Sequence, residues 1–120
     1  GQRQPISVVR GNERIPAKRG SEAGYLFEVA SKGKLDPKAE VFFLTIPVSD
    51  SAAPPNARHS GEEVILVLEG RVRFVYAGAE VILQVGACVQ FDAKIEHCAI
   101  AEGGHKAQLF VVTIPDRVER

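Results

Sequence analysis

The sequence lacks the features that mark several large classes of protein. Its 120 residues include no methionine, no tryptophan and only two cysteines, and no apolar run reaches the roughly 18 residues of a membrane span. We therefore expect no membrane partner, and no disulfide framework of the kind found in small secreted domains. Since methionine is absent, we expect Gly1 to be a scar of tag removal on an excised piece, or of initiator removal beside an engineered glycine.

The chain also lacks an excess of charge of either sign, because 15 basic residues balance 15 acidic ones. No basic stripe is long enough to hold a phosphate backbone by itself, so we do not expect this chain to read DNA directly. Basic residues gather early in the chain, but Glu13 and two prolines interrupt them. We expect these side chains to be solvated on the surface, and the alternative is that they contact a partner or DNA. This early basic group is Arg3, Arg10, Arg14, Lys18 and Arg19.

Several catalytic motifs are missing as well. The sequence contains no GxSxG, no glycine-rich phosphate loop, no CxxC and no HExxH. Nucleophilic hydrolysis, nucleotide binding and zinc-protease chemistry therefore have no anchor in this chain.

The length and the 45% hydrophobic content fit a single domain with its own core. Residues 1–20 are polar and contain Gly, Pro and Arg, which predicts a linker with one edge strand at Ile6–Val9, followed by a folded domain over residues 21–120. Cys88 and Cys98 lie in apolar segments, where we expect small buried core residues. Free buried cysteines are typical of a reducing cytosol, so the predicted location is cytoplasmic.

From Gly24 onward, short apolar segments alternate with turn-forming ones, and helical periodicity is absent. Regular short strands separated by such turns predict an all-β sandwich or barrel. The expected strands are Tyr25–Ala30, Val41–Ile46, Val64–Leu68, Val72–Tyr76, Val81–Val85, Val89–Phe91, Cys98–Ala101 and Leu109–Ile114.

Alternation in the segment RVRFVY indicates which side chains face the core. Val72, Phe74 and Tyr76 share one face of the expected strand, while Arg71 and Arg73 share the other. We expect the arginines to be exposed. Tyr76 is then either a core residue with its hydroxyl hydrogen-bonded or part of the wall of a ligand pocket.

The segment HSGEEVILVLEG, from His59 to Gly70, places a histidine and a glutamate at the entrance of a buried strand. On one straight strand residues i and i+4 lie about 13 Å apart, too far for one metal ion. Ser60 and Gly61 supply a turn, so we expect His59 to end one strand and Glu63 to open the next, with their side chains converging. Glu62 then points the other way, into solvent.

This segment resembles the first motif of the cupin family, with His59, Glu63 and Gly70 in their motif positions. The segment from Gly86 to His97 resembles the second cupin motif. Ala57 stands where the motif has its first histidine. The resemblance implies an all-β, cupin-like double-stranded β-helix (jelly-roll) barrel.

The resemblance also implies a metal site made of His59, Glu63 and His97, for a divalent metal such as Zn, Fe, Mn or Ni, with open positions for water or a small ligand. The expected ligand pocket is these three residues with Tyr76. The alternative is that His59 and Glu63 only hydrogen-bond each other at the mouth of a barrel. We expect His105, in the turn GGHK, to be a surface residue.

A more specific likeness involves Val8–Arg14, Gly24, Tyr25 and the His59 segment together. This combination is similar to the C-terminal sensory domain of cupin-containing helix-turn-helix transcriptional regulators of the XRE type, in which the first motif histidine is often absent. It implies a small-molecule effector, a homodimer, and DNA contact through a separate N-terminal domain. Two alternatives stay open: a stand-alone metal-dependent cupin enzyme such as a dioxygenase, and a metal-free cupin that serves dimerisation.

Overall fold

The computed structural model describes residues 3–17, 24–48 and 56–116. Within these ranges the chain forms strands and turns and no helix, so nothing in them has the length and apolar character of a membrane-crossing helix. The strands are β1 (Ile15–Ala17), β2 (Leu26–Val29), β3 (Glu40–Ile46), β4 (Glu62–Glu69), β5 (Arg71–Tyr76), β6 (Ala79–Leu83), β7 (Cys88–Asp92), β8 (His97–Glu102) and β9 (Ala107–Ile114).

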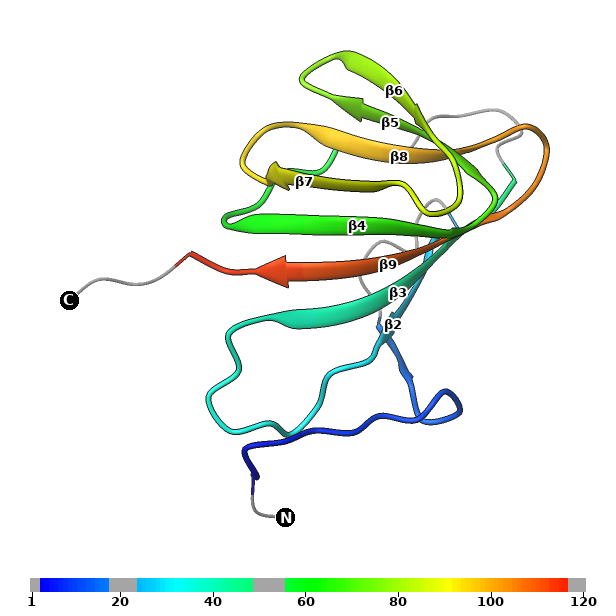
Figure 1. Cartoon of the computed structure of the whole chain (residues 1–120). Coiled ribbons are helices and arrows are strands. Elements are labelled where there is room, and N and C mark those ends of the chain that lie inside the picture. The colour runs from blue at the N-terminus through cyan, green and yellow to red at the C-terminus, as the bar shows by residue number, and fades with distance from the viewer. Residues whose placement is uncertain (1–2, 18–23, 49–55, 117–120) are drawn as a thin grey trace.

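The strands form two antiparallel sheets that face each other (Figure 1). The larger sheet has the order β1-β2-β3-β9-β4-β7, and the smaller has the order β6-β5-β8. From β4 onward the chain passes to the small sheet for β5 and β6, to the large sheet for β7, to the small sheet for β8 and back for β9. This alternation between two sheets is the jelly-roll arrangement, so the predicted all-β fold class is confirmed.

Strict alternation of side chains builds the core between the sheets. On β5, Val72 and Phe74 are 0% and 2% exposed, Arg71 is exposed and Tyr76 is partly buried at the strand end. Arg73 lies on the outer face, where it pairs with Glu80 and Glu102 at 3.0 Å each. β3, β4 and β9 follow the same period of two, as expected for strands with one buried face. Their inward residues are Phe42, Leu44, Ile46, Ile65, Val67, Leu109 and Val111.

One end of the barrel gathers polar side chains, and we call it the rim. β3, β4 and β8 begin there and β5, β7 and β9 end there, at the left in Figure 1. The register agrees, because Glu63 on β4 lies opposite both Thr113 near the end of β9 and Phe91 near the end of β7. On the small sheet, His97 lies opposite Tyr76.

The expected edge strand at Ile6–Val9 is wrong, and the N-terminal strand instead spans Ile15–Ala17, paired with β2. The earlier segment is held by a loop rather than a sheet, because the Gln4 carbonyl accepts a bond from the Leu35 amide at 2.7 Å. The Ser7 hydroxyl similarly donates to the Lys32 carbonyl at 2.5 Å. The division of the chain at residue 20 stays a prediction.

The described members of the early basic group differ in their surroundings. Arg3 and Arg10 are exposed, whereas the guanidinium of Arg14 lies 3.7 Å from the ring centroid of Phe43 and 3.9 Å from a carboxylate oxygen of Glu28. Lys18 and Arg19 lie outside the described residues.

The two cysteines are free, as predicted, but they are not core residues. Cys88 is exposed, because β7 turns Val89 and Phe91 inward and therefore places Cys88 on the outer face of an edge strand. Cys98 is half-buried on the outer face of β8, and this burial raises the pKa of its thiol.

Gly70, in the turn between β4 and β5, has a φ of +80°, and a Cβ there would lie 2.4 Å from the Lys106 carbonyl oxygen. Gly78 has a matching φ of +82° with open space around it. We expect Gly78→Ala to cost about 1–2 kcal/mol from backbone strain alone. Gly70→Ala should cost about 3 kcal/mol or more, because it adds a collision with backbone. Urea unfolding of both variants measures the difference, and equal losses would contradict it.

Tyr25 precedes β2 and connects the two sheets, because its hydroxyl donates to the Ala99 carbonyl on β8. Burial and, to a smaller degree, the charge of Cys98 raise its pKa from 10.0 to about 12. The stability that depends on the protonated hydroxyl is therefore complete below pH 10 and is lost as pH rises through 12. We expect Tyr25→Phe to be less stable by about 1 kcal/mol at neutral pH. Unfolding measured against pH should show this difference shrinking above pH 10, and a constant difference would contradict the assignment.

Candidate functional site

The turn before β4 brings His59 next to Glu63. Gly61 has a φ of +96°, and a Cβ at this position would lie 2.3 Å from the Ile114 carbonyl oxygen, so the backbone packs where no side chain fits. The His59 amide donates to the Ala93 carbonyl and the Ala93 amide donates to the Gly61 carbonyl, each at 2.9 Å. The predicted turn at Ser60 and Gly61 is confirmed.

The strand expected to end at His59 is reduced to a single bridge two residues earlier. Ala57 and His97 exchange both backbone hydrogen bonds, at 2.7 and 3.1 Å. Residues paired in this way carry their side chains on the same face, so the Ala57 methyl group and the His97 ring lie side by side.

Three side chains converge at the rim: His59, Glu63 and His97. One ligand atom from each lies within 4.8 Å of the other two. His59 Nε2 is 3.0 Å from Glu63 Oε2, and the two imidazole centroids are 5.6 Å apart. Two donors bound at about 2.1 Å and at right angles to one metal ion would be about 3.0 Å apart, so the first pair already has a suitable spacing.

Backbone carbonyls fix the orientation of both imidazoles. His59 Nδ1 lies 3.1 Å from the Ser60 carbonyl oxygen, and His97 Nδ1 lies 2.8 Å from the Ile95 carbonyl oxygen. Each Nδ1 therefore carries a hydrogen, and each Nε2 is left for the site. His59 Nε2 and the Glu63 carboxylate oxygen are both electron-pair donors, so their contact at 3.0 Å is favourable only with a proton or a metal cation between them. A divalent cation would take the place of that proton, so the donor set fits a metal ion.

Thr113 holds the glutamate from the neighbouring strand. Its hydroxyl donates to Glu63 Oε2 at 3.3 Å, and both residues are buried, at 8% and 7% exposure. Their register as direct partners on β9 and β4 makes this contact a consequence of the sheet itself. Thr113 therefore restricts the directions in which the carboxylate can point.

An aromatic wall surrounds His97, which is itself 5% exposed. The Phe91 ring centroid lies 4.7 Å from that of His97, and the Phe74 centroid lies 6.4 Å away. Tyr76 packs on Phe91, with ring centroids 5.6 Å apart, and its hydroxyl donates to the Asp92 carbonyl at 2.9 Å. The hydroxyl of Tyr76 is thus already hydrogen-bonded, while its ring packs on Phe91 and Phe74, the two rings that contact His97.

The side of the site away from this wall is more open. The His59 side chain is 32% exposed and Ala57 is exposed, whereas Glu63 and His97 are buried. A set of two histidines and one carboxylate leaves further positions on a metal ion for water or a small molecule. Those positions would be reached from the side of Ala57 and His59.

Other residues considered in the sequence lie apart from this cluster. Glu62 is exposed and accepts a hydrogen bond from Gln90, as predicted for a side chain on the outer face. His105 is exposed in the turn between β8 and β9, at the end of the barrel opposite the rim. The sequence analysis missed Thr113, although a polar residue at the fourth inward position of β9, after Ala107, Leu109 and Val111, was a signal for it.

The comparisons with known proteins agree with this fold. The family model described as Cupin domain matches residues 42–113 of the chain. No curated protein matches the chain in sequence. Among solved structures, hydroxypropylphosphonic acid epoxidase (HppE) from S. wedmorenis in complex with fosfomycin has a TM-score of 0.77 at 22% identity, over 91% of this chain and 59% of that chain.

Two further structures of the same enzyme are similar. Fe(II)-HppE with the alternative substrate (S)-1-HPP has a TM-score of 0.78 at 22% identity, over 91% of this chain and 60% of that chain. Co(II) HppE in complex with substrate has a TM-score of 0.72 at 21% identity, over 91% and 58%. The chain thus spans about 60% of the length of that epoxidase. At this identity the likeness shows a common fold.

Proposed function

The chain belongs to the cupin family, and on that premise we propose that it binds one divalent metal ion through His59, Glu63 and His97 and a small molecule beside it. The observation that carries the proposal is the convergence of these three donors within 4.8 Å. The fixed Nδ1 contacts of both histidines support it, because they leave the two Nε2 atoms facing the site. Tyr76 contributes its ring to the pocket wall.

Iron is the metal that we favour among Zn, Fe, Mn and Ni. Two imidazoles with one carboxylate and open positions are the ligand set typical of non-haem Fe(II) sites. The similar structures also support it, since they are named as containing Fe(II) or Co(II). When bound, such a metal would supply Lewis-acid or redox chemistry to a molecule at the open positions.

The chain's own residues would orient and shield that molecule. Phe91 and Phe74 exclude water from one side of His97, which strengthens electrostatic interactions at the site. Thr113 keeps one oxygen of Glu63 in place. His59, at the exposed edge, lies where a molecule from solvent would enter.

Two uses of such a site remain distinct proposals. An enzymatic use is supported by the ligand set and by the fold shared with an Fe(II)-containing epoxidase. A sensory use, in a regulator that contacts DNA through a separate N-terminal domain, is supported by the motif resemblance of Val8–Arg14 and the His59 segment. The ligand set itself serves either use, because a sensed small molecule could occupy an open position on the metal as a substrate could.

Oxygen consumption and DNA affinity separate the two uses. Fe(II)-loaded protein that consumes oxygen with a candidate small molecule, and loses this activity in His59→Ala, would support the enzyme. A small molecule that changes the DNA affinity of the intact protein, without being converted, would support the sensor, because only differential binding can shift such an equilibrium. The homodimer stays a prediction.

Removal of a ligand should abolish metal binding. We expect His59→Ala and Glu63→Gln each to lower the affinity for Fe(II) or Co(II) by more than about 100-fold, since a lost direct ligand exceeds the effect of an outer partner. His105→Ala is the matched control, because it removes an exposed imidazole at the opposite end of the barrel. Anaerobic titration followed by metal analysis measures these affinities. Unchanged metal content in the two ligand variants would refute the assignment.

The contact from Thr113 should tune that affinity. Thr113→Val keeps the shape of the side chain but removes the hydroxyl that bonds Glu63 Oε2. We expect it to weaken metal binding by about 10-fold, as for other partners of metal ligands. Thr113→Ser retains the hydroxyl and should restore most of the affinity. If valine and serine variants bind equally well, Thr113 does not position the carboxylate.

A further inference from the structure

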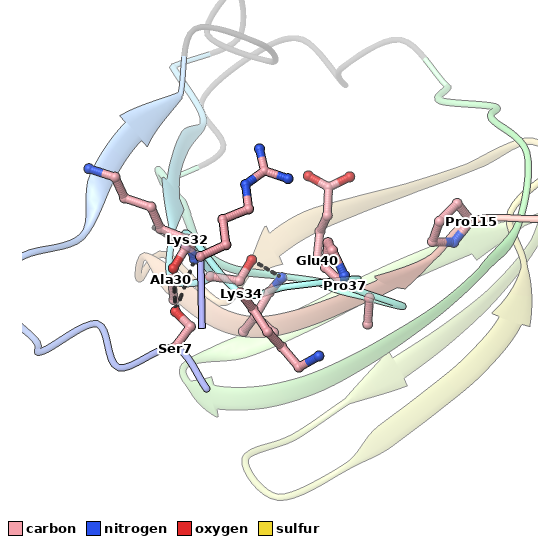
Figure 2. A pocket seen from close by; sticks show the side chains of 12 residues that line it. Ser7, Ala30, Lys32, Lys34, Pro37, Glu40 and Pro115 are labelled. Carbon is pink, nitrogen blue, oxygen red and sulfur yellow. Dashed lines mark hydrogen bonds between the residues drawn. The ribbon is translucent and has the colours of Figure 1, made fainter. Parts of the chain in front are cut away.

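A pocket opens between the N-terminal segment and the loop that leads into β3. It is separate from His59, Glu63 and His97, which we call the triad. Its volume is about 520 Å³. Figure 2 shows Ser7, Lys32 and Lys34 on one side of this space and Glu40 and Pro115 on the other. Arg3 also contributes to the lining.

The charge of this pocket is predominantly positive. Arg3, Lys32 and Lys34 line it against one carboxylate, that of Glu40. Among the residues that the structure describes, none of these three cations lies within ion-pair distance of a carboxylate. Elsewhere, four basic side chains do have carboxylate partners, namely Arg14, Arg58, Arg73 and Lys94.

Hydrogen bonds fix the backbone that carries these cations. The Ser7 hydroxyl donates to the Lys32 carbonyl at 2.5 Å and accepts from the Lys32 amide at 3.3 Å. The Val41 amide donates to the Ser31 hydroxyl at 3.0 Å, and the Lys34 ammonium donates to the Leu35 carbonyl at 2.8 Å. Two segments that are distant in sequence are thus held together at the pocket, and the exposed side chains of Arg3, Lys32 and Lys34 extend from them.

The pocket borders the rim on which the triad lies. Glu40 is the register partner of Thr113, and Thr113 is the register partner of Glu63. Partner residues on neighbouring strands lie about 4.8 Å apart, so Glu40 is about 10 Å from Glu63 along the same row. Glu40 therefore forms the side of the pocket nearest the triad.

We propose that this pocket binds an oxyanion, of the phosphate or carboxylate class, through Arg3, Lys32 and Lys34. The binding of the anion does not require the metal. That the anion belongs to the small molecule held at the triad rests on the proposed function. Such a molecule would have to extend past Glu40, which is itself about 10 Å from Glu63. Glu40, between the two sites, opposes the anion electrostatically and accepts hydrogen bonds from any hydroxyl or amino group of the ligand.

The test uses inorganic phosphate and the metal-free protein at low ionic strength, with amide chemical shifts of residues 31–41 as the readout. The double variant Lys32→Gln/Lys34→Gln should weaken phosphate binding by at least about 10-fold, because two of three cations are lost. The matched control is Arg71→Gln/Lys106→Gln, which removes the same charge from exposed positions at the opposite end of the barrel. It should leave the affinity within about 2-fold. Glu40→Gln should strengthen binding by about 2-fold to 3-fold.

Equal weakening in the two double variants would overturn the proposal, because it would reflect net charge alone. A dissociation constant of the unmodified chain above about 10 mM would overturn it as well. Parallel titrations with acetate distinguish the phosphate class from the carboxylate class by which anion binds more tightly. Because all these measurements omit metal, they stand even where His59→Ala and Glu63→Gln show that the triad binds none.

Discussion

The approach of Gly61 to the end of β9 is the contact on which the candidate site depends. With 2.3 Å between a Cβ at this position and the Ile114 carbonyl oxygen, only glycine lets the backbone pass so close. The chain can then turn within two residues, so His59 faces Glu63 instead of lying about 13 Å away along a strand. The same packing fixes the start of β4 beside the end of β9, and Thr113 reaches Glu63 for that reason.

Much of the fold follows from the local pattern. Alternation in RVRFVY correctly assigned Val72 and Phe74 to the core, and the spacing of short apolar runs predicted the strands of both sheets. Local pattern failed at the margins. Ile6–Val9 has strand-forming residues, but its link to the loop near Lys32 is made by the Ser7 hydroxyl, a contact between segments that no short window contains. The prediction that Cys88 is buried was wrong, because an apolar run does not reveal that its strand lies at a sheet edge.

The site was only partly accessible from the sequence. His59 and Glu63 are close neighbours in the chain, so a turn at Gly61 could be predicted from composition. His97 is 34 positions beyond Glu63, and only the family resemblance placed it with them, because its proximity depends on the crossing from β7 to β8. The partners that orient the two imidazoles were not predictable, since the carbonyls of Ser60 and Ile95 are backbone atoms of a kind present at every residue. Arg3, Lys32 and Lys34 come together only through the folded loop.

The burial of Glu63 indicates that the rim serves binding rather than stability. Glu63 is 7% exposed at a position where the alternation of β4 otherwise places Ile65 and Val67. Its contacts in the described part of the chain are a hydroxyl at 3.3 Å and one imidazole at 3.0 Å, with no lysine or arginine among them. Burying a carboxylate with so little compensation costs free energy that an aliphatic side chain would instead contribute. A residue that breaks the local pattern at such a cost is typical of a functional site, and a cation between Glu63 and the two imidazoles is what would offset it.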